Sequence, residues 1–384
     1  MRYLHCVRSI DPRQGGVASA VRAFAATAAR LGAHPEIATL DPPEADFFDL
    51  PGVRVHGLGP VGSVYGYRPR YSRWLRDRMG DYGACIVDGL WTYHALGFRT
   101  AWPRSRRPYL VFPHGMLDPW FRRAYPLRHL KKSLYWPCNE YRLLRDAHAV
   151  CFTAEEERWR ALGCFRPYRL RSRIVSLGTP APPPASDAQA SAFAEACPAA
   201  AGKRVLLFLA RVDPKKGCDL LLRAFARQAR GHDELHLVMA GPDLAHRQRD
   251  YTVLARELGI ADQVSWPGML AGDAKWGALH AAEAMCLTSH QENFGVGLVE
   301  AMACGTPVLL SDQIAIWREP VAAGAGFAAP DNEAGANRVL ARWLALNADQ
   351  RAAMADAARD LFAERYRIEA ATQGLLALLA EAAG

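Results

Sequence analysis

The stretch Glu292-Asn-Phe-Gly-Val-Gly-Leu-Val-Glu300 is the part of the sequence from which the fold can be read outward. An apolar run at residues 284–287 is typical of a buried strand, and the polar turn after it leads into a helix predicted to begin near Gly295. Gly295 and Gly297 leave the backbone N–H groups of the helix start unshielded, and such a helix end favours anions. We therefore expect a phosphate here, with the two glutamates accepting hydrogen bonds from hydroxyl groups. Acids near a helix start also serve as ordinary caps, so spacing alone leaves that alternative open.

A second candidate phosphate-binding element is Arg211-Val-Asp-Pro-Lys-Lys216-Gly217, which follows a strand expected at residues 204–210 and opens a helix. Arginine grips two oxygens through its planar fork and lysine supplies a compact charge, so the two side chains together suit a diphosphate. The alternative is a solvated basic turn.

Strand and helix patterns alternate along both halves of the chain. We expect strands at residues 3–7, 36–40, 53–56, 84–87, 109–112 and 148–152 in the first half, and at 204–210, 235–240, 264–266, 284–287 and 308–310 in the second. Such alternation is typical of parallel sheets covered by helices on both faces. The sequence therefore predicts an α/β protein with two Rossmann-like domains facing each other across a cleft.

The domain boundary is marked by the Pro-rich run that follows Gly178. We expect an amino-terminal domain at residues 1–178, a Pro- and Ala-rich linker region at 179–203 and a carboxyl-terminal domain at 204–366. A last helix at 367–384 is expected to pack back on the amino-terminal domain.

Composition and charge narrow the function classes. Half of the 384 residues are hydrophobic and 22% are charged, which is a globular composition. Residues 1–178 hold 28 Lys and Arg against 15 Asp and Glu, a balance of +13, whereas the remainder balances to −5. A basic half indicates phosphorylated substrates, an anionic membrane or nucleic acid, and the absence of nucleic-acid-binding signatures argues against the last. Nine cysteines without a C-x-x-C pair are expected to be reduced, and the lack of a signal peptide or membrane span predicts a cytoplasmic protein.

The first half carries two further candidate site elements. A strand, a loop with Gly15 and Gly16, and a helix follow one another, but G-x-G-x-x-G is absent, so a nicotinamide cofactor is not supported. The paired glycines would let the backbone approach a diphosphate, or form an ordinary tight turn. His114-Gly115 follows the strand at 109–112, at the sheet edge where ligands bind in such folds. A lone histidine is often structural, so both roles stay open.

The segment from Trp120 to Trp136 mixes aromatic side chains with Arg122, Arg123, Arg128, Lys131 and Lys132. From residue 127 onward its apolar and basic residues predict an amphipathic helix. That helix either docks on an anionic membrane or lies on the domain surface with its apolar stripe against the core.

These motifs together resemble those of the retaining glycosyltransferases of family 4. The stretch that begins at Glu292 and continues as Ala301-Met-Ala-Cys-Gly-Thr-Pro-Val308 is similar to the E-x-F-G-x-x-x-x-E-A-M-A-x-G-x-P-V signature of that family. The segment from Arg211 to Gly217 is similar to its R-x-(D/E)-x-x-K-G motif. The resemblance is specific over residues 204–310 and looser in the first half. It implies the GT-B fold, although Leu177-Gly-Thr-Pro180 departs from the usual N-G-V-D or N-G-I-D hinge.

The resemblance also implies roles for individual residues. The catalytic set would be His114, Glu292, Arg211 and Lys216, and the donor-binding set would be Gly15, Gly16, Arg211, Lys216, Gly241, Met269, Glu292, Gly295, Val296, Gly297 and Glu300. Glu300 would hold the ribose, Glu292 would contact the transferred sugar, and His114 would lie near its reacting face. The loops with Gly241 and Met269 would contact the nucleobase.

The implied reaction transfers a hexose-type sugar from a GDP- or UDP-sugar to a lipid-linked or glycan acceptor, with retention of configuration, in cell-surface polysaccharide assembly. Without a D-x-D pair in the sequence, no metal or other cofactor is expected. Peripheral contact with the inner face of an anionic membrane follows from the basic first half. Two alternatives are a nucleotide-sugar 2-epimerase of the same fold and a non-catalytic nucleotide-sugar-binding module.

Overall fold

The computed structural model describes residues 1–244 and 246–384, which form two compact units. Unit 1 comprises Met1–Pro180 together with Arg367–Gly384, and unit 2 comprises Ala181–Tyr366. Each unit holds one parallel sheet between two layers of helices, so the predicted pair of Rossmann-like domains is confirmed.

The sheet of unit 1 has the order β3-β2-β1-β4-β5-β6-β7, and all of its strands are parallel. The strands are β1 (Arg2–Val7), β2 (His34–Thr39), β3 (Arg54–Gly57), β4 (Ala84–Asp88), β5 (Tyr109–Phe112), β6 (Ala149–Phe152) and β7 (Ser172–Ile174). Strand β1 and strand β4 are neighbours at the point where the strand order reverses.

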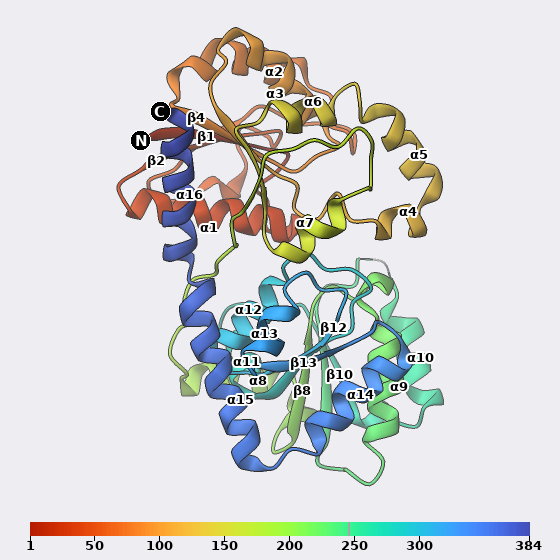
Figure 1. Cartoon of the computed structure of the whole chain (residues 1–384). Coiled ribbons are helices and arrows are strands. Elements are labelled where there is room, and N and C mark those ends of the chain that lie inside the picture. Colours follow the sequence, from red (N-terminus) through yellow and green to blue (C-terminus); the bar gives the residue numbers. More distant parts are fainter. Residues whose placement is uncertain (245) are drawn as a thin grey trace. The chain divides into compact units, whose positions relative to one another are not determined.

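The helices of unit 1 cover both faces of its sheet. They are α1 (Gly16–Arg30), α2 (Pro69–Arg78), α3 (Tyr93–Ala101), α4 (Trp120–Ala124), α5 (Pro126–Tyr135), α6 (Glu140–Asp146), α7 (Glu155–Ala161) and α16 (Ile368–Ala383). Helices α1 and α16 lie side by side on one face, and α2 and α3 lie on the other (Figure 1). The sheet buries Cys85 and Val111 against Phe98 of α3 on one side, and Val7 against Val21 of α1 on the other.

The last helix belongs to unit 1 although its sequence follows unit 2. Thr179 forms a parallel bridge with Arg367, and the Ile368 N–H donates to the Thr179 carbonyl at 3.1 Å. A Cβ on Gly178 would lie 2.6 Å from the Ile368 Cα, so the close approach of the two segments requires glycine at this position.

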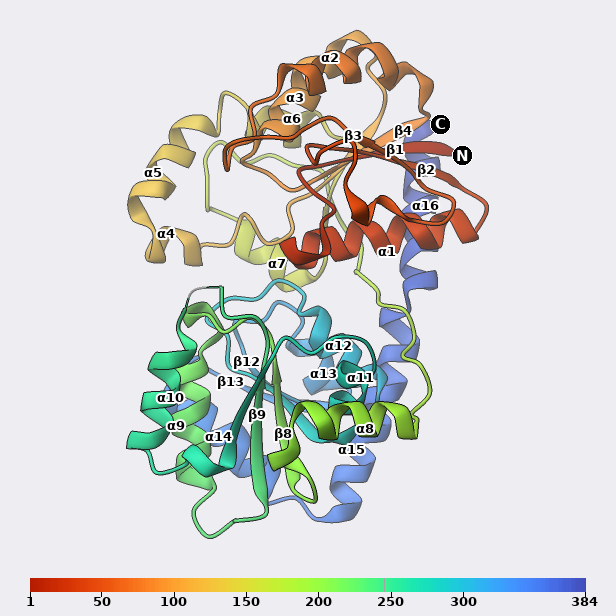
Figure 2. The same cartoon turned by 180° about the vertical axis from the view of Figure 1, so that it is seen from behind.

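Unit 2 has the sheet order β10-β9-β8-β11-β12-β13, again parallel throughout. Its strands are β8 (Arg204–Leu209), β9 (Leu235–Ala240), β10 (Val264–Gly268), β11 (Ala282–Leu287), β12 (Val308–Ser311) and β13 (Gly326–Ala329). Its helices are α8 (Asp187–Ala196), α9 (Cys218–Gln228), α10 (Gln248–Glu257), α11 (Gly272–Ala281), α12 (Val296–Ala303), α13 (Arg318–Ala322), α14 (Glu333–Leu344) and α15 (Ala348–Leu361). Helices α9, α10 and α14 cover one face, and α8, α11, α12 and α15 cover the other (Figure 2).

The segment expected as a linker at 179–203 contains a helix. Ser186 caps α8 by accepting a hydrogen bond from the Gln189 N–H at 3.3 Å, and Phe193 is buried. Helix α8 packs so closely on α11 that a Cβ on Gly277 would lie 2.0 Å from the Gln189 carbonyl oxygen. The Pro-rich run therefore occupies only residues 180–184, before Ser186, and Pro198 opens the turn that follows α8.

Two further expectations concern cysteines and membrane spans. The nine cysteines are free thiols, and all but Cys138 and Cys304 are buried, as expected. Among the helices of the described residues, none combines the length and apolarity that crossing a bilayer demands.

Candidate functional site

The candidate site of unit 2 lies at the carboxyl ends of β8 and β11, the neighbouring strands where the strand order reverses. Ligands of doubly wound sheets bind in the crevice beyond such a switch point. Arg211 and Lys216 follow β8, and Glu292 follows β11, so the fold brings both sequence motifs to one sheet edge.

Lys216 and Glu292 form an ion pair at this edge. Asp213 caps the turn Pro214–Lys216 by accepting from the Lys215 N–H at 2.9 Å, and Gly217 then adopts φ +63. A Cβ on Gly217 would lie 2.2 Å from the Thr288 carbonyl oxygen, so glycine is needed for the turn to pack against the loop after β11. Burial raises the pKa of Glu292, but the Lys216 ammonium outweighs that effect and the net pKa is lowered. Glu292 therefore stays ionised beside Lys216, which is only 7% exposed.

Helix α12 opens directly beyond this pair. Gly295 has φ +73 and is the residue before the helix, and no side chain caps its N–H groups. Val296 and Gly297 supply the first N–H groups of the helix, which is the position expected for an anion. The Lys216 charge and this helix start together favour a diphosphate.

Glu300 lies one turn further along α12 and pairs with Lys275 of α11, whose Nζ is 2.8 Å from the Glu300 Oε1. A pocket of about 220 Å³ opens beside them. Its lining is Leu209, Ala210, Arg211, Gly241, Pro242, Met269, Leu270, Lys275, Gly297 and Glu300. The pocket therefore gathers residues of both motifs with the two loops expected to contact a nucleobase.

Arg211 is exposed and lines the same pocket. It makes no hydrogen bond or ion pair with any of the described residues. A guanidinium without a protein partner beside a helix start is suited to a phosphate oxygen.

A second cluster lies in unit 1, where β1 and β4 end. The Asp88 carboxylate lies between two histidines: its Oδ2 is 2.8 Å from the His5 Nδ1, and its Oδ1 is 3.1 Å from the His114 Nε2. Burial raises the pKa of Asp88, but the two histidines more than offset this and hold the pKa well below the usual range. His114 adopts the left-handed conformation with φ +49, which is strained for a residue other than glycine. The cluster fixes the imidazole of His114 against a permanent carboxylate.

A pocket of about 190 Å³ adjoins this cluster in unit 1 and is lined by Gln14, Asp88, Gly89, Thr92 and His94 among others. Gly15 has φ +94 and precedes α1, and a Cβ on Gly16 would meet no atom within 4 Å. The start of α1 is therefore open to a ligand.

The sequence analysis singled out neither His5 nor Lys275. Residues 5, 88 and 114 are brought together by the pairing of β1, β4 and β5, which sequence spacing does not reveal. Sequence spacing does not reveal the role of Lys275 either, because it pairs with a residue 25 positions away on another helix.

The segment from Trp120 to Trp136 contains α4 and α5. Leu127, Leu130 and Leu134 of α5 are 77%, 59% and 71% exposed, so the alternative in which this apolar stripe packs on the core is wrong. The opposite face of α5 is anchored instead: the Lys132 Nζ lies 4.6 Å from the centre of the Trp91 ring, and the Tyr135 hydroxyl is 2.9 Å from that of Tyr65.

Comparison with known proteins identifies the two halves. Residues 15–178 match the family described as glycosyl transferase 4-like domain, and residues 192–361 match glycosyl transferases group 1. The chain is 36% identical over 190 residues to a D-inositol 3-phosphate glycosyltransferase of Saccharomonospora viridis, a match that covers 46% of this chain and 43% of that protein. It is 38% identical over 115 residues to the protein of the same name from Kribbella flavida, covering 27% and 26%. The chain thus spans less than half the length of these curated relatives.

Two solved structures share the fold over the whole chain. Anabaena HepE in complex with UDP and glucose is 18% identical with a TM-score of 0.76, covering 99% of this chain and 100% of that one. The sucrose-phosphate synthase of Thermosynechococcus elongatus is 19% identical with a TM-score of 0.77, covering 99% of both chains.

Proposed function

We propose that this chain transfers a hexose-type sugar from a nucleoside diphosphate sugar to an acceptor. Its two halves match the glycosyl transferase 4-like and group 1 glycosyltransferase families, and it has the GT-B fold. The observation that carries the proposal is the meeting of the Lys216–Glu292 pair, the open start of α12 and Glu300 at one sheet edge of unit 2.

The donor is bound through its diphosphate and its hydroxyl groups. Lys216, Arg211 and the N–H groups of Val296 and Gly297 hold the diphosphate, and Glu300 accepts from the ribose. Glu292, whose charge Lys216 maintains, accepts from hydroxyls of the transferred sugar. Binding of UDP and glucose by the HepE structure supports a nucleotide donor of the GDP- or UDP-sugar kind.

The chemical step breaks the bond between the anomeric carbon and the leaving phosphate. Negative charge grows on the diphosphate as it leaves, so fixed cations and helix-end donors aimed at it stabilise the transition state. The acceptor hydroxyl forms a new bond to the anomeric carbon on the same face, and the departing phosphate takes the hydroxyl proton. Attack on that face would retain the anomeric configuration. His114, held by Asp88, is the group we assign to the reacting face of the sugar. We expect the reaction to proceed without a metal ion, because cationic side chains supply the countercharge.

The reaction is tested by incubating the purified chain with UDP- and GDP-sugars, with and without EDTA, and measuring release of the nucleoside diphosphate. Acceptor-dependent release that persists in EDTA, with a product of unchanged anomeric configuration by proton NMR, is the expected result. Conversion of a nucleotide sugar into its 2-epimer without acceptor would favour the epimerase instead. Binding without turnover, across lipid-linked and glycan acceptors, would favour a non-catalytic module.

The acceptor in this proposal is membrane-associated, a lipid-linked or glycan intermediate of cell-surface polysaccharide assembly. The exposed stripe of Leu127, Leu130 and Leu134 lies on a helix whose neighbours Arg128 and Lys131 are also exposed. The apolar side chains would insert at headgroup depth, and each cation would add about 1 kcal/mol of binding near anionic lipid. Together they would hold the chain at the inner face of a membrane.

Membrane contact is tested by sedimentation with vesicles of phosphatidylglycerol or of phosphatidylcholine at low salt. The wild type should pellet with the anionic vesicles, and the triple change of Leu127, Leu130 and Leu134 to serine should abolish this. Leu162→Ser is the matched control, because Leu162 is 59% exposed but lies outside α5. Failure of the wild type to bind anionic vesicles would refute the membrane contact while leaving the transfer reaction intact.

A further inference from the structure

Lys275 stands in the first turn of α11 and reaches across to Glu300 of α12. Its side chain is 23% exposed and that of Glu300 is 16% exposed, so the pair is shielded from bulk water. Both residues line the 220 Å³ pocket beside the start of α12.

The position of Lys275 is unfavourable for helix stability. A helix start carries the positive end of the helix dipole, which repels a cation in the first turn. A lysine there is therefore not explained as support for α11, and its contact with the pocket calls for another role.

The donor capacity of Lys275 exceeds its contacts in the protein. An ammonium group has three N–H donors. One points to the Glu300 Oε1, and the Nζ lies 4.1 Å from the centre of the Trp276 ring. Among the described residues no further acceptor contacts it, so at least one donor is available to a ligand in the pocket.

The way in which a nucleotide lies in this pocket follows from the proposed function, on which this inference rests. If the diphosphate lies at Val296 and Gly297 and the ribose at Glu300, the base extends to the loops with Pro242 and Leu270. Lys275 then lies beside the ribose-binding carboxylate at the edge of the base.

We propose that Lys275 is a specificity-determining residue that selects nucleotides whose base carries an oxo group at C4 of a pyrimidine or C6 of a purine. Uracil, thymine and guanine offer a carbonyl oxygen that accepts a hydrogen bond from Lys275. Cytosine and adenine present an amino group at the corresponding position, which would face the ammonium donor against donor. By holding the Glu300 Oε1, Lys275 also leaves the Oε2 to the ribose hydroxyls.

The test is calorimetric titration of the full chain with UDP and CDP, which differ in the oxo and amino groups at one ring position, and with GDP and ADP. We expect at least one oxo nucleotide to bind about 10-fold tighter than its amino counterpart, since only the oxo group can accept a hydrogen bond from the charged donor. Lys275→Met should remove this preference, and Lys275→Arg should keep most of it. Lys203→Met is the matched control, because Lys203 donates to the Asp233 carbonyl at the amino end of the sheet.

The possible results distinguish a failure of base selection from a failure of the proposed function. Equal affinity of the wild type for UDP and CDP and for GDP and ADP would overturn base selection while leaving the donor site standing. Equal weakening of all four nucleotides by Lys275→Met would also overturn it, because Lys275 would then act only through Glu300. Absence of binding for every nucleoside diphosphate would instead count against the proposed function.

Discussion

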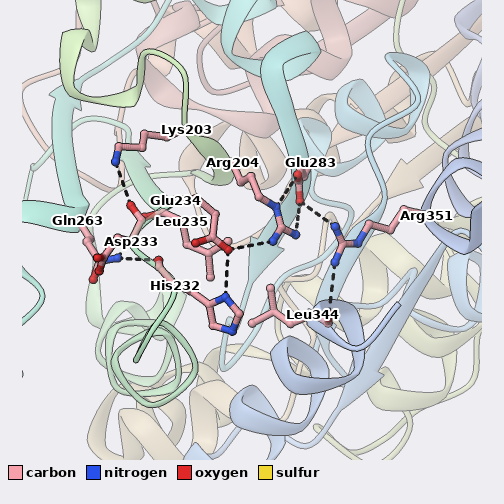
Figure 3. A network of polar contacts seen from close by, with 10 residues as sticks. All are labelled: Lys203, Arg204, His232, Asp233, Glu234, Leu235, Gln263, Glu283, Leu344 and Arg351. Carbon is pink, nitrogen blue, oxygen red and sulfur yellow. Dashed lines mark hydrogen bonds and ion pairs between the residues drawn. The ribbon is translucent and has the colours of Figure 1, made fainter. Parts of the chain in front are cut away.

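The two ends of the unit 2 sheet use the same kinds of charged side chain in different ways. At the amino end, the Arg204 guanidinium makes two hydrogen bonds to Glu283, at 2.9 and 3.0 Å, and one to Glu234 at 3.4 Å. Arg351 of α15 lies 3.7 Å from the same Glu283 and donates to the Leu344 carbonyl (Figure 3). Each charge there has several partners, and the network ties β8 and β11 to a helix.

At the carboxyl end each ion pair joins only two side chains. Lys216 pairs with Glu292, which also accepts from the Asn293 N–H at 3.1 Å, and Lys275 pairs with Glu300. The Arg211 side chain and the Glu300 Oε2 form no hydrogen bond or ion pair with the described residues. Charges with several partners serve the fold, whereas charges with few partners beside an open helix start are available to a ligand. Partner number, more than residue type, therefore separates a structural ion pair from a binding one.

The largest effect is expected for Lys216→Met, which removes a buried cation from the carboxyl end of the sheet. We expect nucleoside diphosphate affinity to fall by about 100-fold, because a charge-assisted hydrogen bond to phosphate is lost and Glu292 is left uncompensated. Isothermal titration calorimetry measures the change. An affinity within twofold of the wild type would contradict a diphosphate site at this edge.

A smaller effect is expected for Glu300→Gln, which keeps the shape of the side chain and removes its charge. Affinity should fall by about 10-fold, since the amide leaves Lys275 without its carboxylate and is a weaker acceptor for the ribose hydroxyls. Titration with inorganic pyrophosphate serves as the control, and its affinity should change little. An equal loss for pyrophosphate would remove Glu300 from the ribose.

At the amino end, Glu283→Gln should alter stability and leave nucleotide binding unchanged. Glu283 is 29% exposed, so the expected loss is about 1 kcal/mol, discounted for solvent screening. For a unit of this size that corresponds to a fall of about 2–4 °C in the melting temperature, which calorimetry can follow. A loss of nucleotide affinity in this variant would erase the distinction between the two ends.

The smallest effect concerns acid. The folded-state pKa of Glu292 is lowered from its usual value of 4.5, so its stabilising contribution is present above that value and is lost as pH falls through the folded-state pKa. Melting temperatures measured from neutral pH downward should therefore fall less steeply for Glu292→Gln than for the wild type below pH 4.5. Identical acid profiles for the two proteins would mean that the Lys216 pair is not maintained in solution.

The sequence predicted most of the fold because its strands are apolar runs with clear boundaries. The short strands β7 and β13 were missed: Ser172–Ile174 is largely exposed at the sheet edge, and Gly326–Ala329 lacks β-branched residues. Helix α8 was hidden by the prolines before Ser186. The local pattern of apolar and polar residues therefore does not predict β7, β13 or α8.

The candidate site was predictable where its residues sit in motifs and hidden where they meet through tertiary contacts. Glu292, Glu300, Arg211 and Lys216 could be proposed from their motifs and from the family resemblance that those motifs carry. The Lys216–Glu292 pair spans 76 positions and the Arg204–Glu283 pair 79, so neither could be read from the sequence.

One calorimetric series tests most directly whether a nucleoside diphosphate binds at the carboxyl edge of the unit 2 sheet. Wild type, Lys216→Met and Glu283→Gln are titrated with UDP and GDP under the same conditions. We predict that the nucleotide binds the wild type and Glu283→Gln with equal affinity, and that its affinity for Lys216→Met is about 100-fold lower. Equal affinity of all three proteins for the nucleotide that binds would contradict it.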